Sequence, residues 1–235
     1  MNYLMGIDLG TSSTKTLIID ELGRTVGIGN ASYGLQIPQI SYAEQDPEEW
    51  WQAVKKSIAE ALKKADIQSK EIRGIGFSGQ MHGMVALDEQ KKLVCPAIIH
   101  LDQRSGAELE EMRSLAGNLM REELLNRPSA GMLISTIYWM KKHQPEQYDR
   151  IRYVMSPKDY IAFRLCGEIG TEYTDAAATL AFSVKNRRWC SEWFRCLGIK
   201  EDIWASVHNS YDIMGKVTKE AAEETGLSTE TSVVC

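Results

Sequence analysis

The stretch GIDLGTSSTK, residues 6–15, restricts the fold of this chain more than any other feature. It lies between two short apolar runs, residues 3–7 and 16–19, and each run predicts a strand. The phosphate-binding loop that precedes a helix needs a second glycine directly before its lysine, and Thr14 occupies that place here. The stretch therefore predicts a β-hairpin whose turn has no helix dipole behind it.

The turn of this hairpin carries groups that can bind a phosphate. A glycine lets a ligand approach the backbone closely, and hydroxyl groups can donate hydrogen bonds to phosphate oxygens. Asp8, at the end of the first strand, offers a hard oxygen ligand to Mg²⁺, either directly or through water. A simpler interpretation stays open, in which the Ser and Thr side chains satisfy the backbone of a plain hairpin. The candidate phosphate-binding residues are Gly10, Thr11, Ser12, Ser13 and Lys15.

A third strand and a long helix follow the hairpin. The turn signal at residues 20–23 leads into an apolar run at 24–31, so the first three strands predict an antiparallel meander. Asp46 precedes Pro47, which is typical of a helix start, and apolar residues then recur at helical spacing as far as Ala65. Further strands are expected at residues 72–78, 84–87 and 97–99. This order of elements predicts an α/β fold.

The second half of the chain is more helical. A helix is expected at residues 104–119, with Met112, Leu115 and Leu119 on one face. Beyond Pro128 further helices are expected at residues 133–142, 157–165, 189–197 and 218–225, and a last strand at 232–235. The pattern predicts an additional helix-rich part beside the α/β core.

Composition and charge exclude several classes of protein. The length of 235 residues suits one large α/β domain or two small ones, and the net charge of −5 argues against a nucleic-acid partner. The five cysteines form no CxxC pair, which argues against a zinc ribbon or a redox motif. No apolar run approaches the ~20 residues of a membrane helix, and the N-terminus lacks the pattern of a signal peptide. We therefore expect a cytoplasmic protein with no membrane partner.

Two loops carry candidate ligand-binding side chains. The loop SGQMHG, residues 78–83, follows a predicted strand, and α/β folds bind ligands at the carboxyl ends of strands. His82 can exchange a hydrogen bond with a ligand hydroxyl and Met81 can cover an apolar part of a ligand, although such a pair in isolation is more often structural. The candidate substrate-binding residues are Gln80, Met81 and His82 from this loop, and His100 and Asp102 from IHLDQR at residues 99–104.

Some of these carboxylates have a structural alternative. Asp102 either holds hydroxyl groups of a ligand or caps the helix that follows and pairs with Arg104, and both interpretations stay open. Lys158 and Asp159, in SPKDY, are expected to be structural. Asp175, in TEYTDAAAT, is expected to be the N-cap of a short helix.

Six stretches together give the chain a family resemblance. They are MGIDLGTSSTK, AEQDPEEWW, GFSGQMHG, residues 96–104, SPKDYIAFRLCGE and TEYTDAAAT. In this order and spacing they resemble the FGGY carbohydrate kinases, part of the actin/Hsp70/sugar-kinase superfamily, and most closely the members that phosphorylate xylulose. The resemblance implies a ribonuclease-H-like mixed sheet flanked by helices. It also implies that residues 1–235 form the N-terminal, sugar-binding lobe.

The same resemblance implies a division of labour between two lobes. ATP and Mg²⁺ would be held between this lobe and a C-terminal ATP-binding lobe that is absent from the sequence. The general base would be an Asp just beyond Cys235, so this chain alone is expected to be inactive. A homodimer is possible for the full-length protein. Because related kinases commonly carry Trp where His100 stands, gluconate, another ketose or a polyol remain alternative substrates to D-xylulose. A non-catalytic sugar-binding module is a further alternative.

Overall fold

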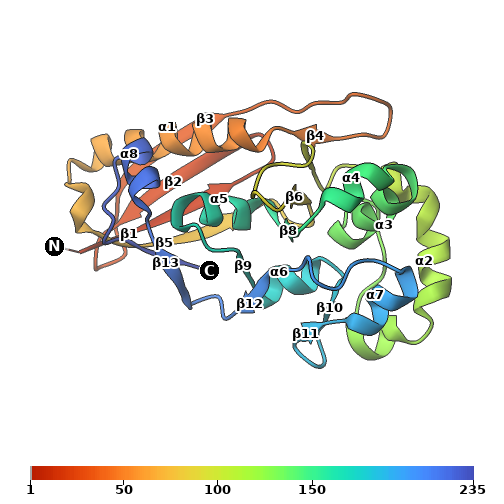
Figure 1. Ribbon diagram of the computed structural model, residues 1–235. Helices are drawn as coiled ribbons and strands as arrows, with labels where there is room; N and C mark the ends of the chain where they lie inside the picture. The colour runs from red at the N-terminus through yellow and green to blue at the C-terminus, as the bar shows by residue number, and fades with distance from the viewer. Residues whose placement is uncertain (1) are drawn as a thin grey trace.

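A six-stranded mixed sheet forms one half of the computed structural model, which describes residues 2–235 (Figure 1). The strand order is β13 (Ile213–Lys216), β14 (Ser232–Val234), β5 (Ile72–Gly79), β1 (Tyr3–Leu9), β2 (Ser13–Ile19) and β3 (Thr25–Ser32). β1, β2 and β3 form the expected antiparallel meander, whereas β5 runs parallel to both β1 and β14. The carboxyl ends of β1, β5 and β14 therefore meet at one edge, where α/β sheets bind ligands.

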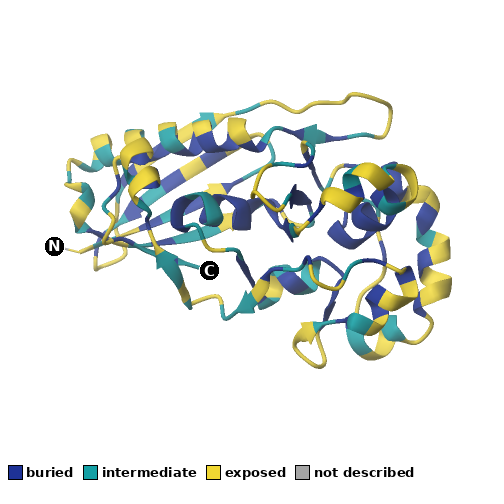
Figure 2. Ribbon diagram, viewed as in Figure 1, coloured by how far each residue is buried: buried dark blue, intermediate teal, exposed yellow. Residues whose placement is uncertain are grey.

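Three helices cover one face of this sheet (Figure 1). They are α1 (Pro47–Ala65), α5 (Pro157–Cys166) and α8 (Lys219–Thr225). α1 begins as expected, because the Asp46 side chain accepts a hydrogen bond from the Glu48 amide and Pro47 occupies the first turn. Its apolar stripe, which includes Trp50, Trp51 and Val54, is buried against the sheet, so buried and exposed residues alternate along the helix in Figure 2.

The contact between α1 and β3 is unusually close. A Cβ on Gly29 would lie 1.9 Å from the Ser57 carbonyl oxygen, and one on Gly27 would lie 2.3 Å from the Ala61 carbonyl oxygen. The helix therefore rests on the strand backbone itself, which side chains at these two positions would prevent. A buried hydrogen bond of 2.7 Å between the hydroxyls of Thr16 and Ser57 fixes the same contact on the neighbouring strand.

The helix-rich part forms a second apolar core beside the sheet. Its helices are α2 (Leu109–Ala116), α3 (Leu133–His143), α4 (Pro145–Arg150), α6 (Tyr173–Ala178) and α7 (Ser191–Leu197). The remaining strands form short pairs: β4 (Glu44–Gln45) with β7 (Ala97–Ile98), β6 (Val85–Leu87) with β8 (Tyr153–Met155), β9 (Gly170–Glu172) with β12 (Ser206–His208), and β10 (Phe182–Ser183) with β11 (Arg188–Trp189). The predicted α/β core with an added helical part is thus confirmed.

The prediction of one continuous helix at residues 104–119 is wrong. The chain instead forms a 3₁₀ helix at Arg104–Glu108 and α2 at Leu109–Ala116. After Gly117, which has a φ of 50°, it forms a π-helical turn at Met120–Leu124. Met112 is buried as expected, whereas Leu115 is 41% exposed. Another short 3₁₀ helix, Ser69–Glu71, leads into β5.

None of the helices within residues 2–235 has the length and apolar character that a membrane crossing requires. All five cysteines are free thiols. Burial raises the pKa of the Cys166 and Cys190 thiols, which keeps both of them neutral near pH 7.

Gly29→Ala is expected to lower the free energy of unfolding by about 1–3 kcal/mol, because the new methyl group overlaps the backbone of α1. Urea unfolding followed by circular dichroism measures the difference. Gly106→Ala is the matched control, since a Cβ there meets nothing within 4 Å. Equal destabilisation by the two substitutions would contradict the close packing of α1 on β3.

Candidate active site

The turn after β1 is tight, and it leaves backbone donors open. The Gly10 amide donates to the Ser13 carbonyl over 3.0 Å, and a Cβ on Gly10 would lie 3.1 Å from that same oxygen. Among the described residues, the amides of Thr11 and Ser12 have no acceptor. The Tyr33 hydroxyl donates to the Gly10 carbonyl, and burial, followed by the charge of Asp8, raises the pKa of Tyr33 and keeps it a donor. The structure thus brings the predicted phosphate-binding residues together around open N–H and O–H groups.

A row of polar side chains crosses the sheet beside this turn. Asp8 pairs in register with Lys15 on β2 and with Ser78 on β5. Because side chains alternate along a strand, Asp8 points to the face opposite the buried Ile7 and Leu9. The row borders a cavity of about 410 Å³ on that open face. Ser78 was not predicted as a site residue, and its position only becomes visible from the register of the parallel strands.

This row fits a magnesium–phosphate group. In the part of the chain that the structure describes, no three His, Cys, Asp or Glu side chains converge as a ready-made metal site. Asp8 can therefore offer a single carboxylate, and Mg²⁺ is commonly bound in this way, with water and phosphate oxygens as its other ligands. Lys15 and the open amides of the turn lie where they could balance the phosphate charge.

Gln45 links the turn to the second predicted loop. It is 1% exposed, and its Nε2 donates to the carbonyl oxygens of Thr11 and Gly34 over 2.7 and 2.9 Å. Its Oε1 accepts from Nε2 of Gln80 and from the Trp50 indole. The Gln80 amide nitrogen is thus committed to Gln45, and the substrate contact predicted for Gln80 stays a prediction. Gln45 itself was missed, because the sequence marks it only as a neighbour of the helix cap.

His82 and His100 lie close enough together to interact electrostatically. Nδ1 of His82 is 2.8 Å from the Ala178 carbonyl oxygen, which can only accept, so Nδ1 carries a proton and the neutral ring keeps Nε2 as an acceptor. Burial, and then the nearby His82, lower the pKa of His100. His100 Nδ1 is buried without a hydrogen-bond partner among the described residues. Met81 is 55% exposed and available to a ligand. Substrate contacts by these three residues stay predictions.

Asp102 forms a buried ion pair with Arg104, which is the structural one of the two interpretations of the sequence. Its carboxylate accepts hydrogen bonds from the amides of Ala43 and Arg104 and from the Arg104 guanidinium, which also binds Glu44 over 2.6 Å. Burial lowers the pKa of Arg104, but its hydrogen bonds and charge contacts with Asp102 and Glu44 outweigh burial and raise it. The described carboxylate therefore holds the loop in place, and its contact with a sugar remains a prediction.

A polar cavity of about 370 Å³ lies on the other side of Ser78 and Met81. Lys158, Glu172 and Asp175 line it, together with the end of β14 at Val234 and Cys235. The cap assigned to Asp175 is wrong: Glu172 is the N-cap of α6 and accepts from the amides of Thr174 and Asp175. The sequence pattern failed here because both carboxylates stand near the helix start, and only the fold shows which one precedes it.

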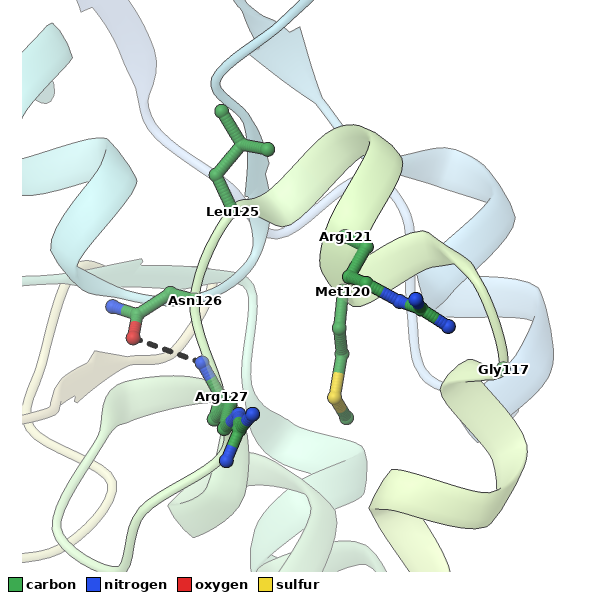
Figure 3. Close-up of a pocket in the computed structure, with 6 residues that line it drawn as sticks. All are labelled: Gly117, Met120, Arg121, Leu125, Asn126 and Arg127. Atoms are coloured by element: carbon green, nitrogen blue, oxygen red, sulfur yellow. Dashed lines mark hydrogen bonds between the residues drawn. The ribbon is translucent and has the colours of Figure 1, made fainter.

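Another pocket, of about 420 Å³, lies in the helix-rich part and is shown in Figure 3. Its lining residues are Gly117, Met120, Arg121, Leu125, Asn126 and Arg127. The polar side chains in this lining are exposed and include no carboxylate, and none of the predicted site residues belongs to it. The candidate site is therefore at the sheet edge.

The hairpin turn, the polar row and the cavity at the parallel strand ends define an α/β ligand-binding lobe. A model of the N-terminal domain of the FGGY family of carbohydrate kinases matches residues 3–235. The chain belongs to this family, which confirms the resemblance read from the sequence motifs.

Curated relatives and solved structures agree with this assignment. The chain is 35% identical over 233 residues to a xylulose kinase from Bacillus subtilis, covering 99% of this chain and 47% of that protein. The crystal structure of a xyloylose kinase from Brucella ovis matches with a TM-score of 0.90 at 33% identity, over 99% of this chain and 47% of the other. A gluconate kinase from Lactobacillus acidophilus shares the fold, with a TM-score of 0.91 at 24% identity over 99% of this chain and 47% of the other. The chain thus spans about half the length of the relatives it matches.

Arg104→Ala is expected to lower the free energy of unfolding by about 3–5 kcal/mol, because it leaves the buried Asp102 carboxylate without its counter-charge. Arg113→Ala is the control: it removes an exposed pair with Glu110 and should cost about 0–1 kcal/mol. Urea unfolding near pH 7 compares the two variants. A loss below 1 kcal/mol for Arg104→Ala would show that the ion pair does not hold this loop.

Proposed function

We propose that this chain is the sugar-binding half of an ATP-dependent carbohydrate kinase, and that its substrate is D-xylulose, which the complete enzyme converts to D-xylulose 5-phosphate. The observation that carries the proposal is the shared position of Ser78, which borders both the cavity beside Asp8 and the cavity beside Lys158. The polar row beside the hairpin turn and the polar cavity thus adjoin at Ser78. Membership of a carbohydrate kinase family supports assigning phosphate binding to the side with Asp8 and sugar binding to the side with Lys158.

The residues of this chain would bind and orient rather than complete the reaction. ATP supplies the phosphoryl group and Mg²⁺ neutralises its charge, and Asp8, Lys15 and the turn at residues 10–13 are the groups that would hold them. Proton removal from the sugar hydroxyl requires a base, which we assign to an Asp beyond Cys235 in the complete enzyme. A second lobe there would also hold the rest of the nucleotide and exclude water from the cleft.

The choice of sugar rests on the relatives rather than on the fold. A xylulose kinase from Bacillus subtilis is 35% identical, whereas the fold is shared with a gluconate kinase of 24% identity. A titration of the isotope-labelled chain with D-xylulose, D-gluconate and xylitol, followed by nuclear magnetic resonance, tests the proposal directly. D-xylulose is expected to shift amide signals of residues 78–83 at the lowest concentration. Saturable binding of gluconate in preference to D-xylulose would overturn the proposed substrate.

The purified chain by itself is expected to show no sugar-dependent release of ADP from ATP. The expected base and the lobe that would hold the nucleotide lie outside these residues, so ATP would be poorly held and the hydroxyl poorly activated. A coupled ADP assay with D-xylulose and Mg²⁺ measures this. Turnover that rises with chain concentration and survives repurification would contradict the assignment of the missing catalytic groups.

His82→Asn is expected to weaken D-xylulose binding about 10-fold, the cost of about one lost hydrogen bond at Nε2. Asn is chosen because it tolerates the left-handed backbone of this position, where φ is 68°. His208→Asn, at a histidine that binds the Ser206 hydroxyl, is the control and should bind the sugar as the wild type does. Calorimetry that gives the same affinity for all three proteins would remove His82 from the site.

A further inference from the structure

Three charged side chains form a buried cluster at the cavity next to Ser78. Lys158 lies in the first turn of α5, and its Nζ contacts Asp159 Oδ1 at 2.7 Å and Asp175 Oδ2 at 3.3 Å. The Ser156 hydroxyl donates to Asp159 Oδ2 at 2.6 Å and approaches Asp175 Oδ2 at 3.2 Å. The side chains of Lys158, Asp159 and Asp175 are 11%, 2% and 13% exposed. These three side chains are thus held in place at the edge of a cavity, although the sequence suggested no ligand for them.

The charges of the cluster support one another. Burial alone would lower the pKa of Lys158, but the carboxylates of Asp159 and Asp175 raise it, so the ammonium stays charged. Burial raises the pKa of Asp175, the ammonium of Lys158 opposes this, and the nearby charges of Asp159 and Glu172 add to the increase, so the pKa stays above its usual value. Glu172, the other carboxylate of the lining, is stabilised by hydrogen bonds from Thr174, the Asp175 amide and the Ser210 hydroxyl.

Asp175 keeps one carboxylate oxygen open. Its described partners, Ser156 and Lys158, both bind Oδ2. Oδ1 has no hydrogen-bond partner among the described residues. It is not one of the fully buried unpartnered polar atoms either, so it is accessible, and Asp175 lines the cavity. Lys158 uses two of its three donors on the carboxylates and also borders the cavity. An acceptor and a donor therefore stand side by side in the lining.

We propose that Asp175 and Lys158 form a hydroxyl-binding subsite of the sugar cavity, in which Asp175 Oδ1 accepts a hydrogen bond from one hydroxyl of an uncharged ketose or polyol. Lys158 positions this carboxylate by binding its other oxygen, which the Ser156 hydroxyl oxygen also approaches. The inference rests on the proposed sugar-binding function and deepens it, because it names side chains that contact the substrate. Nothing in the motifs of the turn or of residues 78–83 requires this pair.

The balance of charge in the lining selects the class of ligand. Two carboxylates, those of Glu172 and Asp175, line the cavity beside the one ammonium of Lys158, which also pairs with Asp159 outside the lining, so the carboxylate of a sugar acid would meet a site that is already negative. A cation would meet the ammonium 3.3 Å from the open carboxylate. A neutral hydroxyl avoids both costs, since it can donate to Asp175 and accept from Lys158. The subsite therefore favours a ketose or polyol over gluconate.

The test is a double-mutant cycle between Asp175→Asn and the hydroxyls of the sugar, with affinities from calorimetry. Asp175→Asn keeps the shape of the side chain and is expected to weaken D-xylulose binding about 10- to 100-fold, as for a hydrogen bond to a charged group. The four monodeoxy analogues of D-xylulose are then titrated into both proteins. One analogue should bind the wild type weakly and lose nothing further in the variant, which a purely structural role of Asp175 would not produce.

Controls separate the possible failures. Asp202→Asn changes an exposed carboxylate and should leave all affinities unchanged. If Asp175→Asn fails to fold, the amide shifts of Thr174 and Asp175 in the wild type decide, since ligand at the subsite must move them. Equal losses for all four analogues, or unmoved amides during saturable binding, overturn the subsite and leave sugar binding intact. Absence of saturable binding of D-xylulose, gluconate and xylitol to the wild type overturns the proposed function and the subsite together.

Discussion

The site depends on one buried amide, that of Gln45. Its two ends bind four groups: the carbonyls of Thr11 and Gly34, the indole of Trp50 and the amide of Gln80. These groups belong to the turn after β1, the segment before α1, α1 itself and the loop after β5. A buried amide left half satisfied is costly, so displacement of any one of these segments is opposed by the others. The turn and the loop at residues 78–83 are consequently held at a fixed separation.

Preorganisation also governs the charged groups. Asp102 and Arg104 are saturated by each other and by neighbouring backbone, whereas Asp175 is saturated on one oxygen and open on the other. The first arrangement suits a group that holds a loop, and the second suits a group that meets a ligand. Both carboxylates are acidic residues near helix starts, so the number of filled lone pairs, rather than residue type or position, distinguishes their roles.

The elements that could be predicted from the sequence are those set by local patterns. The hairpin, the cap at Asp46 and the long apolar stripe of α1 follow from turn chemistry, capping and periodicity, and the six motifs indicated the family correctly. Gln45, Ser78 and the cluster around Lys158 depend on register and on contacts between residues far apart in the chain, such as Lys158 with Asp175. No periodicity records such contacts. The helix at 104–119 failed because Gly117 and a 3₁₀ start divide an otherwise helical pattern.

The linings of the two cavities differ in chemistry. The side with Asp8 and Lys15 carries one carboxylate, one ammonium and the Ser78 hydroxyl among glycine and apolar residues, and these polar groups suit a phosphate–magnesium group without distinguishing one sugar from another. The side with Lys158, Glu172 and Asp175 is built from fixed charges on α5 and at the start of α6, whose pattern of donors and acceptors can match one set of hydroxyls and oppose a charged ligand. A shared fold between sugar kinases of different substrates is expected under this division. Substrate choice then resides in a few side chains that the sheet edge presents to the cavity at Ser78.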